Sequence, residues 1–209
     1  MTSSKLEPSN IESSKANQHA KDAQPAKTSD SHPLQIASLP LNSIEQGLHG
    51  NIGLTFCPGK QHRSYLSGRW LRDLDTDLKV IQDWGATAWL NLMEDQDLIA
   101  VNLDPTVFKA SVLSANIDYY HLPIVDGSIP NQQTTEDWER LSPILRYHLQ
   151  QGGNLLIHCR GGLGRTGMIA ARLLVELGCP SDIAITTIRK LRPGSIENDE
   201  QEQWVEYDL

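Results

Sequence analysis

The sequence predicts an α/β fold in which a central, largely parallel sheet is flanked by helices. Segments with strand character alternate along the chain with segments of helical periodicity, which is typical of such sheets. In addition, a glycine-rich loop joins an apolar run at residues 155–157 to an apolar helical segment at 168–177. A chain of 209 residues is long enough for one domain of ordinary size plus a tail.

The first half of the domain contains three strands and two helices. Leucine and isoleucine at helical spacing predict a helix over residues 73–84, and Gly85 ends it. Asp104 and Pro105 supply the cap and the first position of the next helix. We expect strands at residues 36–39, 52–56 and 87–92, and helices at residues 73–84 and 104–115.

The second half follows the same alternation. Pro143 removes one backbone hydrogen bond from a long helix, so we expect a kink or a break near Leu141. The helix after the glycine-rich loop is apolar almost all round, which predicts a buried central helix. We expect strands at residues 118–124 and 154–158, helices at residues 134–151, 168–177 and 181–191, and a last helix with Ile196, Trp204 and Tyr207 facing inward.

The glycine-rich loop at residues 158–167 has the composition of an anion site. A loop of this kind directs several backbone N–H groups at one point beside the positive end of a helix, which suits phosphate. The same groups stabilise a thiolate, so we expect Cys159 to be nucleophilic. Arg165 supplies a planar fork that binds two phosphoryl oxygens at once. The loop therefore suits attack of a thiolate on a phosphate ester.

Two other interpretations explain less of this loop. A buried structural thiol in a tight turn leaves the glycines and Arg165 without a role. A zinc site built on His158 and Cys159 lacks a second pair of ligands at the usual spacing. We expect no metal and no cofactor.

Residues 1–33 differ in composition from the rest of the chain. They contain no aromatic residue, and their only branched aliphatic residues are Leu6 and Ile11. Such a segment buries too little apolar surface to offset its chain entropy. We therefore expect a disordered tail at residues 1–33 and a phosphate-binding domain at residues 34–209, and removal of the tail should leave stability unchanged.

Charge and cysteine content narrow the class of protein. The net charge of −8 falls on the domain, because acids and bases balance in the tail. An acidic domain is a poor candidate for nucleic-acid binding. Three scattered cysteines argue against a disulfide framework and for a reducing compartment. With no apolar run of membrane-spanning length, we expect a soluble cytoplasmic monomer that does not bind membranes.

The loop also resembles a known signature. His158-Cys159 followed after five residues by Arg165-Thr166 is similar to the motif of the protein tyrosine and dual-specificity phosphatases. The form Gly161-Gly162-Leu163-Gly164, with an upstream Val-Asp-Gly at residues 125–127, is most similar to the cyclin-dependent kinase-associated phosphatase group. The resemblance extends from about residue 53 to the C-terminus and implies the cysteine-phosphatase fold.

The resemblance implies a role for each residue of the loop and for Asp126. Cys159 corresponds to the nucleophile and Arg165 to the phosphate fork, while Thr166 donates to the Cys159 sulfur. By itself Asp126-Gly127 is a common turn pair, but the resemblance makes Asp126 the general acid, which later acts as a base. His158 is expected to orient the loop through hydrogen bonds. The residues expected to hold the phosphate are Arg160, Gly161, Gly162, Leu163 and Gly164.

One position departs from the family pattern. Glu197 stands where many members have the first of two glutamines, which helps to place the hydrolytic water, and Gln201 matches the second. A glutamate also accepts a hydrogen bond from water, but it adds negative charge beside a phosphoryl intermediate. The departure therefore concerns the second step of the reaction and leaves the reaction class as expected.

The expected substrate is a phosphorylated protein, with phosphotyrosine or dual specificity. Lipid phosphatases of the superfamily carry lysines in the loop, and this loop has only Arg160 besides Arg165. The alternatives are a phosphoinositide or an RNA 5′-phosphate as substrate, or a phosphate-reading binding module without turnover. Such a module would have lost Cys159, Arg165 or Asp126, and all three are present.

Overall fold

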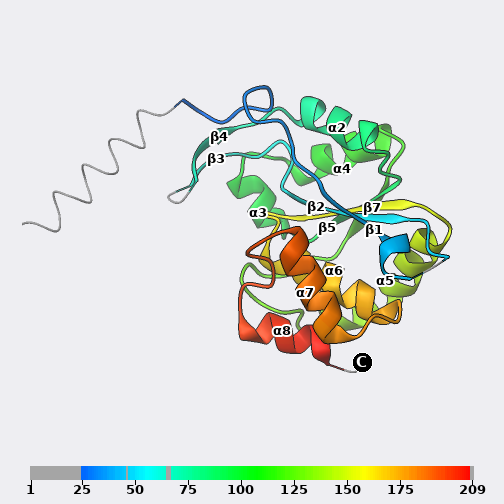
Figure 1. Cartoon of the computed structure of the whole chain (residues 1–209). Helices are drawn as coiled ribbons and strands as arrows, with labels where there is room; N and C mark the ends of the chain where they lie inside the picture. The colour runs from blue at the N-terminus through cyan, green and yellow to red at the C-terminus, as the bar shows by residue number, and fades with distance from the viewer. Residues whose placement is uncertain (1–24, 46, 65–66, 208–209) are drawn as a thin grey trace, which may run out of the picture.

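A computed structural model describes residues 25–45, 47–64 and 67–207 of the chain. Its five-stranded sheet has helices on both faces, and a two-stranded hairpin lies beside it (Figure 1). The α/β fold predicted from the sequence is confirmed. None of the helices in these residues is both long enough and apolar enough to cross a membrane.

The sheet has the strand order β1-β2-β7-β5-β6, and only β1 runs antiparallel to its neighbour. The central strand, β7, is buried from Leu155 to Cys159, as expected for a parallel strand covered on both faces. Its carboxyl end is the position where open α/β sheets place their ligands. The strands are β1 (Ala37–Pro40), β2 (Asn51–Phe56), β5 (Ala88–Asn91), β6 (Asp118–His121) and β7 (Asn154–Cys159).

The helices form two layers. Helices α2 (Leu74–Asp83) and α4 (Pro105–Ser114) lie over one face of the sheet, and α5 to α8 lie over the other (Figure 1). Helix α6 is the predicted central helix, because 11 of its 13 residues are buried. The helices of the second layer are α5 (Gln132–Gln150), α6 (Gly164–Glu176), α7 (Ser181–Leu191) and α8 (Asp199–Glu206).

Side-chain caps fix where several helices begin. Asp104 accepts hydrogen bonds from the backbone N–H groups of Thr106 and Val107 and so starts α4, as predicted. Helix α5 runs through Pro143 without the break that we considered near Leu141. The hydrogen bond lost at Pro143 is offset by burial on both sides of it, since Trp138, Leu145 and Leu149 are all fully buried.

The structure differs locally from the sequence-based predictions in three respects. The hairpin of β3 (Gln61–Ser64) and β4 (Gly68–Leu71) and the short helix α3 (Asp95–Ala100) were not predicted, because both are short and lack a clear apolar periodicity. The strand expected at residues 118–124 ends at His121, although Leu122 and Ile124 still donate backbone hydrogen bonds to Asn91 and Leu92. Tyr207 does not face inward: it is 65% exposed.

The predicted tail lies only partly within the described residues. Residues 25–33 are described, and they contact the hairpin. Lys27 exchanges backbone hydrogen bonds with Arg69 and Leu71, and its ammonium lies 4.9 Å from the Trp70 ring. The Ser29 hydroxyl bonds to the backbone N–H and C=O of Asp73. The described part of the expected tail, from Lys27 onward, is therefore packed against the domain, and the rest of that tail lies outside the described residues.

Removal of residues 1–33 is therefore expected to destabilise the protein, whereas removal of residues 1–24 serves as the matched control. The longer deletion loses the contacts of Lys27 and Ser29 and the His32 carbonyl that accepts from buried Arg72 at 2.7 Å. About five hydrogen bonds at about 1 kcal/mol each correspond to a fall in melting temperature on the order of 10 °C. Equal melting temperatures for the two deletions, measured by calorimetry, would show that these contacts do not stabilise the domain.

Candidate active site

The loop after β7 curls around the sulfur of Cys159. Cys159 is the last residue of β7 and is 3% exposed. The backbone N–H of Gly162 donates to its Sγ at 3.2 Å. Gly162 has φ +69°, and a Cβ there would lie 2.3 Å from the Thr55 carbonyl oxygen. Only glycine therefore allows the loop to make this turn.

Basic side chains hold the outer side of the same loop. Lys60 Nζ donates to the Arg160 carbonyl at 3.2 Å. Arg192 donates to the carbonyls of Gly161 and Gly162. The carbonyls of three successive loop residues are thus held by basic side chains, and the N–H that follows the Gly161 carbonyl is the one that donates to the Cys159 sulfur. The sequence did not predict this contribution of Lys60 and Arg192.

The first turn of α6 completes the cradle. Helix α6 begins at Gly164, four residues earlier than expected, so Arg165 and Thr166 lie in its first turn. The residue before the helix, Leu163, provides no side-chain cap. The positive end of the helix dipole therefore faces the loop. Such a helix end favours an anion.

Arg165 is held by acidic and carbonyl groups from two other segments. Its guanidinium, 1% exposed, donates from Nη1 to Asp97 Oδ2 at 2.7 Å and to the Ile124 carbonyl at 2.8 Å. Nη2 lies 2.7 Å from Asp126 Oδ1 in an ion pair without the alignment of a hydrogen bond. Burial opposes the charge, but Cys159, Asp97 and Asp126 together raise the pKa of Arg165. The contact of Asp97 with Arg165 was not predicted from the sequence.

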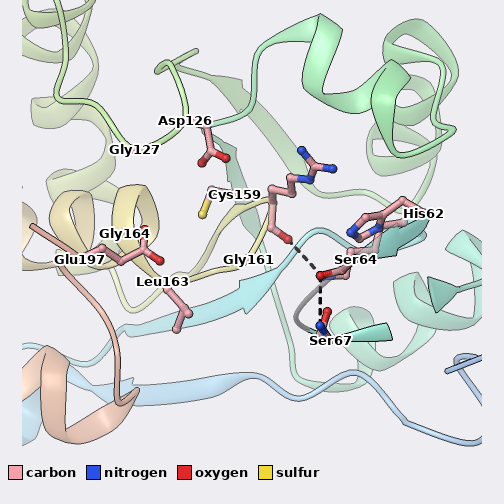
Figure 2. A pocket seen from close by; sticks show the side chains of 12 residues that line it. His62, Ser64, Ser67, Asp126, Gly127, Cys159, Gly161, Leu163, Gly164 and Glu197 are labelled. Atoms are coloured by element: carbon pink, nitrogen blue, oxygen red, sulfur yellow. Dashed lines mark hydrogen bonds between the residues drawn. The ribbon is translucent and has the colours of Figure 1, made fainter. Parts of the chain in front are cut away.

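Asp126 reaches the site from the segment after β6. Its carboxylate is 59% exposed, and Figure 2 shows it directed into the same pocket as the Cys159 sulfur. The next residue, Gly127, has φ +74°, and its carbonyl accepts a hydrogen bond from Asn198 at 2.9 Å. The structure therefore brings Asp126 to the cradle, as the resemblance implied, although its role as an acid stays a prediction.

Glu197 also lines the pocket, and Gln201 supports it from the buried side. Gln201 is fully buried, and its Oε1 accepts from the Glu197 backbone N–H at 2.9 Å. The Glu197 carboxylate packs against Gly164 so closely that a Cβ there would lie 2.2 Å from Oε2. Burial, and then the charge of Asp126, raise the pKa of Glu197.

His158 and Thr166 do not make the hydrogen bonds expected of them. The His158 ring packs edge-on against Trp89, with centroids 5.5 Å apart, and no hydrogen bond of ordinary geometry joins its nitrogens to the described residues, whereas the Cys159 backbone opposes the effect of burial on its pKa. Burial lowers the pKa of His158 to about 3, so the ring is neutral. The Thr166 hydroxyl is also without a partner in the part of the chain that the structure describes. The contribution of His158 visible here is packing.

The pocket above the loop has a volume of about 360 Å³. The β3–β4 hairpin contributes one wall, which the sequence did not predict. Seven of the lining residues belong to the predicted site. The lining residues are Lys60, His62, Ser64, Ser67, Asp126, Gly127, Cys159, Arg160, Gly161, Leu163, Gly164 and Glu197. No group of three or more His, Cys, Asp or Glu among the described residues is arranged to hold a metal ion.

Lys60 gives the pocket a cation that titrates near neutral pH. Its ammonium lies 4.4 Å from the Phe56 ring centroid and 4.5 Å from that of Trp70. Burial, opposed by the neighbouring Cys57, lowers the pKa of Lys60 to about 8. Cys57 itself is fully buried, and burial raises its pKa to about 12. A deeply buried thiol of this kind is inert.

A strand–loop–helix cradle around one buried cysteine, with an arginine fork, defines a phosphate-binding α/β domain of the cysteine-phosphatase fold. Residues 72–205 match a family model described as a Swiss Army Knife protein, DSP-PTPase phosphatase domain. The chain belongs to this family of tyrosine and dual-specificity phosphatases. The resemblance noted in the sequence is thereby confirmed.

Individual relatives match shorter parts of the chain than the family model does. The chain is 32% identical over 95 residues to protein tyrosine phosphatase type IVA 2 of Mus musculus, covering 46% of this chain and 56% of that protein. It is 34% identical over 103 residues to dual specificity protein phosphatase CDC14AB of Danio rerio, covering 48% and 16%. The chain thus spans little more than half of the first of these relatives.

Solved structures share the fold. A kinase associated phosphatase whose catalytic-site cysteine is substituted by serine superposes with a TM-score of 0.70 at 24% identity, covering 83% of this chain and 92% of that one. The active form of Tk-PTP gives a TM-score of 0.57 at 23% identity, covering 76% and 92%. At these identities the similarity concerns architecture alone.

Proposed function

We propose that this chain is a phosphoprotein phosphatase that hydrolyses phosphate monoesters through a cysteinyl-phosphate intermediate on Cys159. The observation that carries the proposal is the Gly162 N–H directed at the Cys159 sulfur at 3.2 Å, inside a pocket that Asp126 also lines. An N–H donor at this position favours a thiolate, which is the nucleophilic form of cysteine. Family membership supports the same reaction class.

In the first step the Cys159 sulfur attacks phosphorus. The S–P bond forms, the P–O ester bond breaks, and Asp126 gives its proton to the leaving oxygen. The inward N–H groups of the loop and Arg165 stabilise the charge on the equatorial oxygens. Since Asp126 now pairs with Arg165 at 2.7 Å, phosphate binding must replace that contact and release the carboxylate toward the leaving group.

In the second step a water molecule attacks the cysteinyl phosphate. The O–P bond forms, the S–P bond breaks, and the electron pair returns to sulfur as a thiolate. A carboxylate of the pocket takes the water proton, and the family resemblance assigns this role to Asp126. Thr166, whose hydroxyl is unpartnered among the described residues, is proposed to donate to the departing sulfur.

The proposed substrate is a protein carrying phosphotyrosine, or phosphotyrosine together with phosphoserine or phosphothreonine. The relatives are named tyrosine or dual specificity phosphatases, and the loop itself carries no lysine. The three cysteines of the described chain are unpaired, and the reaction needs Cys159 reduced. We therefore propose that the protein acts in the cytoplasm, as a monomer.

Asp126→Asn is expected to slow hydrolysis of phosphotyrosine by about a hundredfold or more. A nitrophenyl phosphate should be slowed much less, because its leaving oxygen departs without a proton. The measurement is kcat/KM for both substrates, since kcat also contains the second step.

Asp118→Asn is the matched control, because Asp118 is exposed at the opposite end of β6. It should behave as wild type. If Asp126→Asn slows both substrates equally, Asp126 is only a turn residue.

A further inference from the structure

We propose that Glu197 is the general base of the second step, taking the proton from the water that hydrolyses the cysteinyl phosphate, while Asp126 serves as the acid of the first step. This inference rests on the proposed function. It divides between two carboxylates the acid and base roles that the family resemblance gives to one.

The position of Glu197 fits this role. Glu197 lines the pocket together with Cys159 and Asp126. In Figure 2 its carboxylate lies beside Gly164, on the side of the pocket that the Cys159 sulfur faces, whereas Asp126 enters from another segment. The two carboxylates thus enter the pocket from different segments, so a water between Glu197 and the phosphoryl group need not compete with the Asp126 side chain.

The backbone around Glu197 is held on both sides. Ile196, 3% exposed, has φ +59°, a strained conformation for a β-branched residue. Its carbonyl accepts from Arg189 at 3.2 Å, and the Glu197 N–H donates to Gln201. Asn198 donates to the Gly127 carbonyl. Strain that is fixed by surrounding contacts is characteristic of functional positions.

The two carboxylates of the pocket differ in their partners. Asp126 forms an ion pair with Arg165. The Glu197 carboxylate has no ion pair among the described residues, and its hydrogen-bond partner is the Gly164 backbone. It therefore has an oxygen free to accept a proton. Burial raises its pKa above the ordinary value of 4.5, which brings a base closer to neutral pH and makes proton transfer more effective.

The proton balance of the step is simple. The water oxygen bonds to phosphorus, sulfur leaves as a thiolate, and one water proton passes to a Glu197 oxygen. Glu197 then releases that proton to solvent before the next cycle. A glutamine at this position accepts a hydrogen bond from water and so places it, but it does not accept the proton. Replacement of Glu197 by glutamine therefore separates the two roles.

The test is stopped-flow hydrolysis of a nitrophenyl phosphate by wild type, Glu197→Gln and Glu197→Ala. Both variants should release one equivalent of nitrophenol per active site at close to the wild-type first-turnover rate. Steady-state kcat should then fall about a hundredfold or more in both. The wild-type kcat should decline at low pH as Glu197 becomes protonated, and Glu197→Gln should lack this decline.

The groups that face Glu197 are Asp126, Arg165 and the Gly164 N–H. The same pocket is also lined by Lys60, His62, Arg160 and Cys159. A decline of kcat with pH is therefore assigned to Glu197 only if it disappears in Glu197→Gln.

Two results would overturn the inference. If Glu197→Gln keeps the wild-type kcat while Glu197→Ala loses it, Glu197 only places the water. If the first turnover slows as much as the steady state, Glu197 acts before the second step. Neither result touches the proposed function, which would instead fail if Cys159→Ser turned over normally.

Discussion

Cys159→Ser is expected to reduce hydrolysis of aryl phosphates to background while the cradle still binds phosphate or vanadate. A serine hydroxyl is not ionised at neutral pH and is a much weaker nucleophile than a thiolate. The exchange leaves the loop intact, because the Gly162 N–H that donates to sulfur at 3.2 Å also finds an acceptor in the serine oxygen. The two readouts are kcat for a nitrophenyl phosphate and vanadate binding by calorimetry.

Cys179→Ser is the matched control for this substitution. Cys179 lies beyond the far end of α6, away from the pocket, and is 9% exposed. The control should hydrolyse phosphate esters at the wild-type rate. If Cys159→Ser retained activity within about tenfold of wild type, Cys159 would not be the nucleophile.

Arg165→Lys is expected to lower kcat/KM by about a thousandfold. A lysine ammonium is a point charge and does not replace a planar fork that holds two phosphoryl oxygens at once. A thousandfold corresponds to about 4 kcal/mol of transition-state stabilisation. In this structure Nη1 of the fork already contacts Asp97 and the Ile124 carbonyl, and Nη2 contacts Asp126, so its orientation is set before substrate binds.

Substitution of a second buried arginine in the same helix is the control that distinguishes lost phosphate binding from lost stability. Arg172 is 6% exposed, pairs with Glu176 and lies two turns from the cradle. Arg172→Lys should lower the melting temperature but leave kcat/KM near the wild-type value. If kcat/KM of Arg165→Lys were also near normal, the loop would not hold phosphate by this fork.

The parts of the site that the sequence predicted are those encoded within one segment. Cys159, the glycines and Arg165 all lie between β7 and the first turn of α6, where local geometry follows from the glycine pattern. The parallel sheet was predictable for the same reason, because each strand and helix has its own apolar periodicity.

The parts that the sequence did not predict come from distant segments. Asp97 is 68 residues from Arg165, and Lys60 is 100 residues from the Arg160 carbonyl that it holds. Asp97 stands in a short acidic helix, and Lys60 follows a Pro-Gly turn. Neither position has a local pattern that indicates a site. Only the packing of α3 and of the β3–β4 hairpin against the loop brings these two side chains to it.

The most direct test of the central claim is the site of covalent phosphate in a quenched reaction. Wild-type protein mixed with a radiolabelled phosphotyrosine peptide is quenched in acid within one turnover and digested. We expect the label on the peptide that contains Cys159. The same peptide from Cys159→Ser should carry no label. Label on another residue, or turnover without any covalent label on Cys159, would contradict the cysteinyl-phosphate mechanism.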